Sequence, residues 1–96
     1  KLNQSAFYES DEISQALLAI DGRLVSQVTG RDYLAQLRGD GNSGSALTSG
    51  WLQLNVDLGV LNAGTHSITI GAHNNKKTLI NERTDLFIDD IVVTAQ

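Results

Sequence analysis

The sequence predicts an all-β protein built as a sandwich of two antiparallel sheets, and three observations support that fold class. Short segments that alternate apolar and polar residues recur along the chain, as half-buried strands do. Nine glycines and no proline are available for the turns between them. Only the region 9–20 is a serious helix candidate. A length of 96 residues fits a single module, 1–96.

The segment from Ile13 to Val28 is expected to form a β-hairpin. Apolar stretches lie on both sides of Asp21-Gly22, and Asp-Gly favours the two-residue turn in which both residues have positive φ. A helix over 9–20 is the alternative, because Glu, Gln, Ala and Leu favour helices. The hairpin is preferred because a strand-like segment follows the turn at once.

The clearest strand pattern lies in Trp51 to Leu58, after a polar, glycine-rich loop over 38–50. Apolar and polar residues alternate there without a fault. The residues expected to face inward are Leu52, Leu54, Val56 and Leu58. Further strands are expected over 33–37, 65–72 and 84–94.

Charge and composition exclude several classes of partner. The net charge is −4, with 11 acidic and 7 basic residues, so neither a nucleic-acid phosphate backbone nor an anionic membrane is expected as a partner. No apolar stretch approaches the ~20 residues of a membrane-spanning helix, so no membrane insertion is expected. Cysteine is absent, which excludes disulfides and thiol chemistry.

No catalytic residues are predicted, and the chain is not expected to be an enzyme. No serine lies in a Gly-x-Ser-x-Gly motif, and the two histidines have no zinc-ligand spacing. His66 is interpreted as a hydrogen-bonded core residue on the apolar face of its strand. His73 is placed in the loop that follows.

Two adjacent carboxylates, Asp89 and Asp90, interrupt the apolar segment near the C-terminus. Alternation would turn one of them toward the core, where an unpaired charge costs several kcal/mol. A bound Ca²⁺ would offset that cost, because it takes six to eight oxygen ligands. The alternative is a strand end at which both carboxylates are solvated or bonded to backbone N–H groups.

Aromatic residues offer a possible surface for sugar rings. Alternation places Trp51 on the polar face of its strand, where it could stack on a sugar together with Tyr8 or Tyr33. Asn74, in the polar loop 73–82, is a further candidate contact. The alternative is that Trp51 packs beneath the preceding loop.

A family resemblance rests on motifs that occur in order along nearly the whole chain. The sequence resembles the C-terminal part of a jelly-roll module of secreted and surface bacterial proteins, and it is similar to the carbohydrate-binding modules with a calcium-bound β-sandwich. The motifs are Tyr8-Glu9-Ser10-Asp11-Glu12, Asp21-Gly22, Asp40-Gly41-Asn42, Gly50-Trp51, Ala63-Gly64-Thr65-His66, Asn74-Asn75-Lys76-Lys77-Thr78, Glu82 and Ile88-Asp89-Asp90-Ile91.

The resemblance implies a calcium ion that ties Asp89 and Asp90 to acidic groups elsewhere, among them Glu12, Asp11 and Glu82. It also implies a non-catalytic module, extracellular or on the cell surface, that binds a polysaccharide or cell-surface glycan. A structural or adhesin spacer without a sugar site is the alternative function.

The N-terminal residues already look like the end of a strand, with no turn before them. Five or six strands are few for two packed sheets, and unpaired strand edges are normally covered. A complementing N-terminal segment or chain is therefore expected to complete the jelly-roll-like sandwich. An independently complete small sandwich is the alternative.

Overall fold

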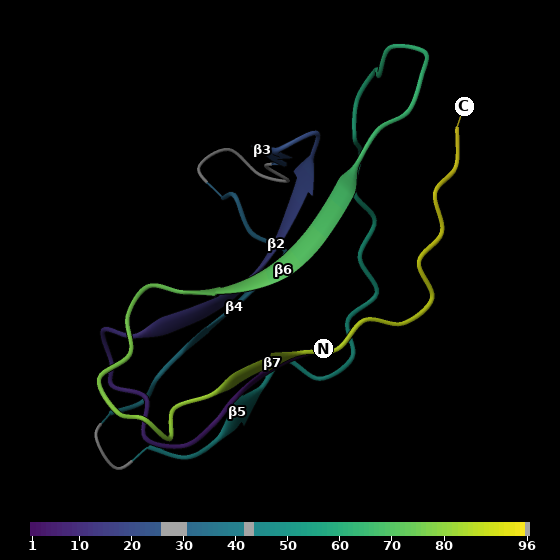
Figure 1. Ribbon diagram of the computed structural model, residues 1–96. Coiled ribbons are helices and arrows are strands. Elements are labelled where there is room, and N and C mark those ends of the chain that lie inside the picture. Colours follow the sequence, from purple (N-terminus) through teal and green to yellow (C-terminus); the bar gives the residue numbers. More distant parts are fainter. Residues whose placement is uncertain (26–30, 42–43, 96) are drawn as a thin grey trace.

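A computed structural model describes residues 1–25, 31–41 and 44–95 of the chain, and in those ranges every regular element is a β-strand. The described part of the chain holds no helix that could cross a membrane. The strands form two antiparallel sheets that are not closed into a barrel, an arrangement consistent with a β-sandwich (Figure 1). The predicted fold class is confirmed.

The larger sheet is built around its longest strand, β2 (Ile13–Ile20). One edge of β2 pairs with β6 (Ile68–Asn74) over seven positions, from Ser14↔Asn74 to Ile20↔Ile68. The other edge pairs first with β4 (Ala35–Arg38) and then with β3 (Arg23–Leu24). Strand β2 is therefore paired along both edges.

The smaller sheet is centred on β1 (Leu2–Gln4), which lies between β5 (Leu47–Thr48) and β7 (Thr84–Leu86). All three strands are short. Backbone pairing on both sides of β1 extends to its first residues, where the Ser49 N–H donates to the Leu2 carbonyl and the Phe87 N–H donates to the Lys1 carbonyl. The expected strand end near the N-terminus is thus present as β1.

Alternation along β2 positions the core between the sheets. Every second residue of the strand is buried, whereas the residues between them are half-buried on the outer face. The predicted hairpin turn follows at once, with φ of 51° at Asp21 and 83° at Gly22, as the two-residue turn requires. The helix alternative for 9–20 is wrong, and residues 26–28 of the expected hairpin lie outside the described residues. The buried apolar side chains are Leu2, Tyr8, Ala16, Leu18 and Ile20.

A polar network crosses the core and ties the two sheets together. Gln4 Nε2 of β1 donates to Ser14 Oγ of β2 at 3.0 Å, and Ser14 Oγ donates to Asn74 Oδ1 of β6 at 2.8 Å. From the smaller sheet, Thr84 Oγ1 donates to the same Asn74 oxygen at 2.7 Å. One amide oxygen therefore joins strands of both sheets, which stabilises their relative position.

Of the two most extensive strand predictions in the second half of the chain, the one for 51–58 is wrong and the one for 84–94 is confirmed only at its start. Residues 51–58 form no strand, and their expected inward residues are not buried, with Leu52 47 % exposed and Leu54 42 % exposed. Of the strand expected over 84–94, only β7 and the following Phe87 are paired. The physical reason is the same in both places: among the described residues, no backbone lies beside these segments to complete a ladder.

Three boundaries differ by a few residues. The strand expected over 33–37 is β4, and the strand expected over 65–72 is β6, which includes His73 instead of ending before it. The loop expected over 38–50 contains the short strand β5. Pairing with β2 and β1 fixes these limits, and propensity alone does not carry that information.

Candidate functional site

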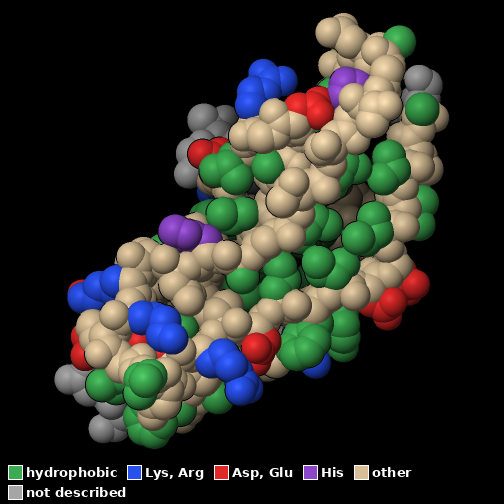
Figure 2. Space-filling model, in the orientation of Figure 1, with side chains coloured by type: hydrophobic (Ala, Val, Ile, Leu, Met, Phe, Trp, Pro, Cys, Tyr) green, Lys and Arg blue, Asp and Glu red, His purple; other side chains and the backbone are tan. Residues whose placement is uncertain are grey.

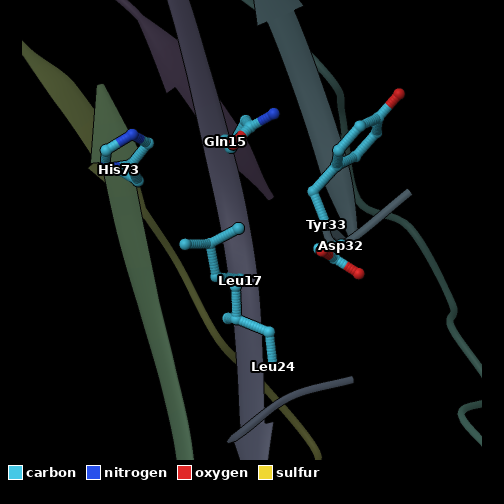
Figure 3. Close-up of a pocket in the computed structure, with 6 residues that line it drawn as sticks. All are labelled: Gln15, Leu17, Leu24, Asp32, Tyr33 and His73. Carbon is cyan, nitrogen blue, oxygen red and sulfur yellow. The ribbon is translucent and has the colours of Figure 1, made fainter. Parts of the chain in front are cut away.

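A shallow pocket of about 350 Å³ opens on the outer face of the larger sheet (Figure 3). Its volume is at the lower end of the range for small-molecule sites, which is roughly 300–1,000 Å³. Two apolar side chains and four side chains with polar groups surround it. The residues that line it are Gln15, Leu17, Leu24, Asp32, Tyr33 and His73.

Strand alternation explains how these side chains reach one face. Gln15 and Leu17 are on the half-buried face of β2, opposite the buried core residues. His73 is directly across from Gln15 in the β2–β6 ladder, so the two share that face. Tyr33 comes just before β4 and lies on the other side of β2 from His73 (Figure 3).

The pocket combines the aromatic ring of Tyr33 with polar side chains that can form hydrogen bonds to the hydroxyl groups of a ligand. The amide of Gln15 donates through Nε2 to Gln36 Oε1 at 2.7 Å, which holds the side chain across the neighbouring strand. Asp32 offers acceptors, and the imidazole of His73 offers one donor and one acceptor when neutral. An aromatic ring beside convergent polar groups is the combination that binds a polyhydroxylated ring.

The other residues predicted to contact sugar do not join this surface. Tyr8 is buried, and its hydroxyl is hydrogen-bonded to Thr84 Oγ1 at 3.0 Å. Asn74 is engaged in the network between the sheets. Trp51 is 60 % exposed and does not pack under the loop, but its ring lies beside the smaller sheet, 5.0 Å from Lys1 Nζ. Of the four candidates, only Tyr33 lines the pocket.

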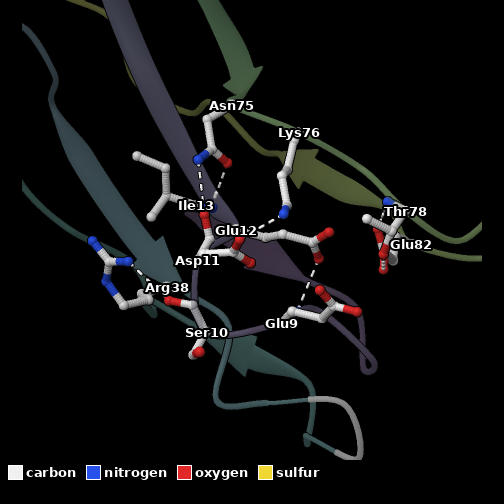
Figure 4. A network of polar contacts seen from close by, with 10 residues as sticks. All are labelled: Glu9, Ser10, Asp11, Glu12, Ile13, Arg38, Asn75, Lys76, Thr78 and Glu82. Carbon is white, nitrogen blue, oxygen red and sulfur yellow. Dashed lines mark hydrogen bonds and ion pairs between the residues drawn. The ribbon is translucent and has the colours of Figure 1, made fainter.

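A second group of polar residues lies where the chain enters β2 (Figure 4). Glu12 is fully buried, and its Oε2 accepts the Glu9 N–H at 2.9 Å. Its other oxygen, Oε1, is buried with no hydrogen-bond partner among the described residues. A buried carboxylate oxygen without a donor is costly unless something positive neutralises it.

The neighbours of Glu12 in the predicted metal set are each engaged differently. Asp11 is exposed and pairs with Lys76 Nζ at 2.5 Å; that hydrogen bond lowers the pKa of Asp11 and raises the pKa of Lys76. Glu82 is buried, and its carboxylate accepts the Thr78 N–H at 3.0 Å and the Thr78 hydroxyl at 3.3 Å.

The prediction that one of Asp89 and Asp90 faces the core is wrong. Both are exposed on the segment that follows β7, and Asp90 has a φ of 53°. That segment has no partner strand among the described residues, so there is no core side toward which alternation could turn a carboxylate. Among the described residues, no three His, Cys, Asp or Glu side chains gather into a metal-binding group. The five predicted ligands therefore do not form one site, and only the Glu12 oxygen fits a cation.

His66 is hydrogen-bonded as predicted but does not lie in the core. Its Nδ1 is 2.6 Å from Asp21 Oδ2, and its Nε2 is 2.5 Å from the Asn62 carbonyl oxygen. The pKa of His66 is raised mainly by its hydrogen bond with the Asn62 carbonyl and to a smaller extent by the one with Asp21, because both favour the protonated ring. The pKa of Asp21 is lowered mainly by its hydrogen bond with His66 and to a smaller extent by the hydrogen bond from the Ser67 N–H. The pair ties the hairpin turn to the chain entering β6.

Sequence reasoning missed most of the pocket. The alternation of β2 does identify Gln15 and Leu17 as outer-face residues, and that signal was available. The sequence predicts a loop at His73, and a loop residue has no defined partner across a sheet, so the pattern does not place His73 opposite Gln15. That position depends on the β2–β6 register, which is a long-range property.

Comparisons of this chain with protein-family models, with curated protein sequences and with solved structures find no match. The assignment therefore rests on architecture alone: the chain is an all-β protein with two antiparallel sheets.

Proposed function

We propose that this chain is a non-catalytic carbohydrate-binding module of a secreted or surface protein, and that its sugar site is the pocket on the outer face of the larger sheet. The observation that carries the proposal is that Tyr33, Gln15 and His73, from three separate segments, line one shallow, solvent-facing hollow. Shallow sites of this kind suit one or two units of a polysaccharide or cell-surface glycan better than an enclosed small molecule.

The roles of the residues follow from their chemistry. The Tyr33 ring packs against the apolar face of a sugar ring. Gln15, Asp32 and His73 bond its hydroxyls, and the anchoring of Gln15 by Gln36 reduces the entropy lost on binding. Leu17 supplies an apolar floor.

Binding to a panel of polysaccharides and glycans tests this proposal. For a glycan retained by the wild-type chain, Tyr33→Ala is expected to weaken binding about fivefold, since loss of a stacking contact costs on the order of 1 kcal/mol. Trp51→Ala is the matched control: it removes an exposed aromatic ring that does not line the pocket. Equal loss in both variants, or no loss in Tyr33→Ala, would contradict the assignment.

We also propose that Ca²⁺ stabilises the fold through Glu12. The unpartnered, buried Oε1 supports this, because a hard cation takes carboxylate and carbonyl oxygens as ligands. Calcium is expected to raise the melting temperature over that in chelator, because a ligand of the native state alone stabilises it.

Two variants separate this site from the C-terminal aspartates. Glu12→Gln should abolish the calcium-dependent shift and should melt at or above the wild-type temperature in chelator, because it removes a buried charge. Asp90→Asn should retain the full shift. A shift lost in Asp90→Asn but kept in Glu12→Gln would overturn the proposal.

A structural or adhesin spacer remains the second candidate, and the elongated shape favours it. The molecule measures 50 × 23 × 22 Å. A wild-type chain that retains no glycan in the panel, yet is stabilised by calcium, would support this function over sugar binding.

A further inference from the structure

Two extended segments, 51–58 and 88–95, lie on the smaller-sheet side of the molecule without strand partners. No backbone hydrogen bond from either segment is found among the described residues. Their apolar side chains are largely exposed, and Figure 2 shows hydrophobic side chains gathered around a hollow between β6 and the C-terminal segment. Unpaired backbone beside exposed apolar side chains is the edge that natural sheets normally cover.

Both segments continue strands that already flank β1. Segment 51–58 follows β5, which pairs with β1 in the register Asn3↔Thr48. Segment 88–95 follows β7, which pairs with β1 in the register Leu2↔Leu86. Both neighbours are antiparallel to β1, so the two segments run in the same direction, as Figure 1 shows beyond the N-terminus.

Lys1 is the last residue to occupy the space between them. Its amino group donates to the Phe87 carbonyl at 2.7 Å, and its carbonyl accepts the Phe87 N–H at 2.8 Å. Beyond Lys1, along the line of β1, the described residues place no backbone between the two segments. An unpaired backbone therefore lies on each side of this space, and the space continues the line of β1.

Two residues with positive φ set which side chains would face inward along this space. The first is Gly50 (φ 67°), next to Ser49, whose side-chain oxygen accepts the Leu2 N–H in place of a ladder carbonyl. A left-handed residue within an extended segment adds one residue to that strand, as in a β-bulge, and shifts the alternation by one. The shift places Leu52 and Leu54 on the inward side that Leu2 occupies.

Asp90 (φ 53°) has the same effect in the other segment. Ile88 falls on the inward side before it, and Ile91 and Val93 fall there after it. Along the empty position, successive inward sites are then flanked by Leu or Val from one segment and by Ile, Val or Ala from the other. The pairs that result are Leu52 with Ile88, Leu54 with Ile91, Val56 with Val93, and Leu58 with Ala95.

We propose that one further β-strand of about seven residues fills this space, runs directly into Lys1, and carries apolar side chains at the first, third, fifth and seventh positions before Lys1. It would pair with both segments, so that each of the three short strands of the smaller sheet would continue as a long strand and the sheet would cover the core. Covalent continuity with Lys1 is favoured over a separate molecule, because a strand already in line with β1 loses no translational freedom on docking.

The test adds a seven-residue extension to the N-terminus of the chain. The matched extension places Val or Ile at the odd positions before Lys1 and Thr or Lys at the even positions. The control extension shifts the pattern by one residue, with Thr or Lys at the four odd positions and Val or Ile at the three even positions, so that every apolar side chain would turn outward. Hydrogen exchange is measured for the amides of 51–58 and 88–95, together with sedimentation of each chain.

The matched extension is expected to slow exchange in both segments by about tenfold or more and to leave the chain monomeric. The shifted extension is expected to protect the amides of the two segments no more than they are protected in the unextended chain. Equal protection by both extensions, or by neither, would overturn the proposal. Slow exchange in the unextended chain with the mass of a dimer would also overturn it, because a second copy would then fill the space.

Discussion

The larger sheet and the two segments that leave the smaller sheet have equally regular alternation but different structures. Strand β2 alternates between buried and half-buried residues and pairs along both edges. Segment 51–58 alternates at least as cleanly in sequence, yet it is unpaired and exposed. The comparison teaches that alternation determines which face a residue takes, whereas a neighbouring backbone determines whether a strand forms.

The largest contrast is expected between leucines of the two regions. Leu18→Ala, in β2, should lower the free energy of unfolding by about 2–5 kcal/mol, because it removes a core side chain. Leu54→Ala should change it by less than about 0.5 kcal/mol, because that side chain is exposed. Urea unfolding followed by fluorescence measures both, and similar losses would remove the distinction between the regions.

A smaller loss is expected at the glycine after β4. The position where a side-chain carbon of Gly39 would lie is occupied by the carbonyl groups of Tyr8 and Glu9. Gly39→Ala should therefore cost about 1–3 kcal/mol by overpacking. Gly71→Ala, in β6, is the control: nothing lies within 4 Å of the added carbon. A loss at Gly71 as large as that at Gly39 would contradict the packing described for the entry to β2.

The smallest effect is a pH dependence at the hairpin turn. The pKa of His66 is raised above its ordinary value of 6.5 in the folded protein. The contribution of His66 to the free energy of unfolding is therefore complete below pH 6.5 and is lost as the pH rises through the raised pKa. The pKa of Asp21 is lowered from its ordinary value of 3.8. The contribution of Asp21 to the free energy of unfolding is therefore present above pH 3.8 and is lost as the pH falls through the lowered pKa. The melting temperature of the wild type relative to His66→Gln should therefore decline on raising the pH above 6.5. A constant difference from pH 5 to 9 would show that the pair is not ionised as described.

The features that were predictable from sequence are those encoded locally. Asp21-Gly22 specifies a hairpin turn by its φ angles, and the sheet class follows from repeated short alternation. The pocket was not predictable, because His73 reaches Gln15 through a register between distant strands. The fate of 51–58 was not predictable either, since its pattern is that of a paired strand and its missing neighbour is not a local property. The buried Glu12 gave no signal beyond its place in an acidic cluster.

Backbone hydrogen exchange of the unextended chain tests most directly whether pairing, and not alternation, distinguishes the two regions. Amides of β2 and β6 that donate within the larger sheet should exchange slowly, near the rate set by global unfolding. Amides of 51–58 and 88–95 in the same monomer should exchange close to the rate of an unstructured peptide. Slow exchange in those two segments of a monomeric chain would contradict the account, because it would mean that they already have hydrogen-bonded neighbours.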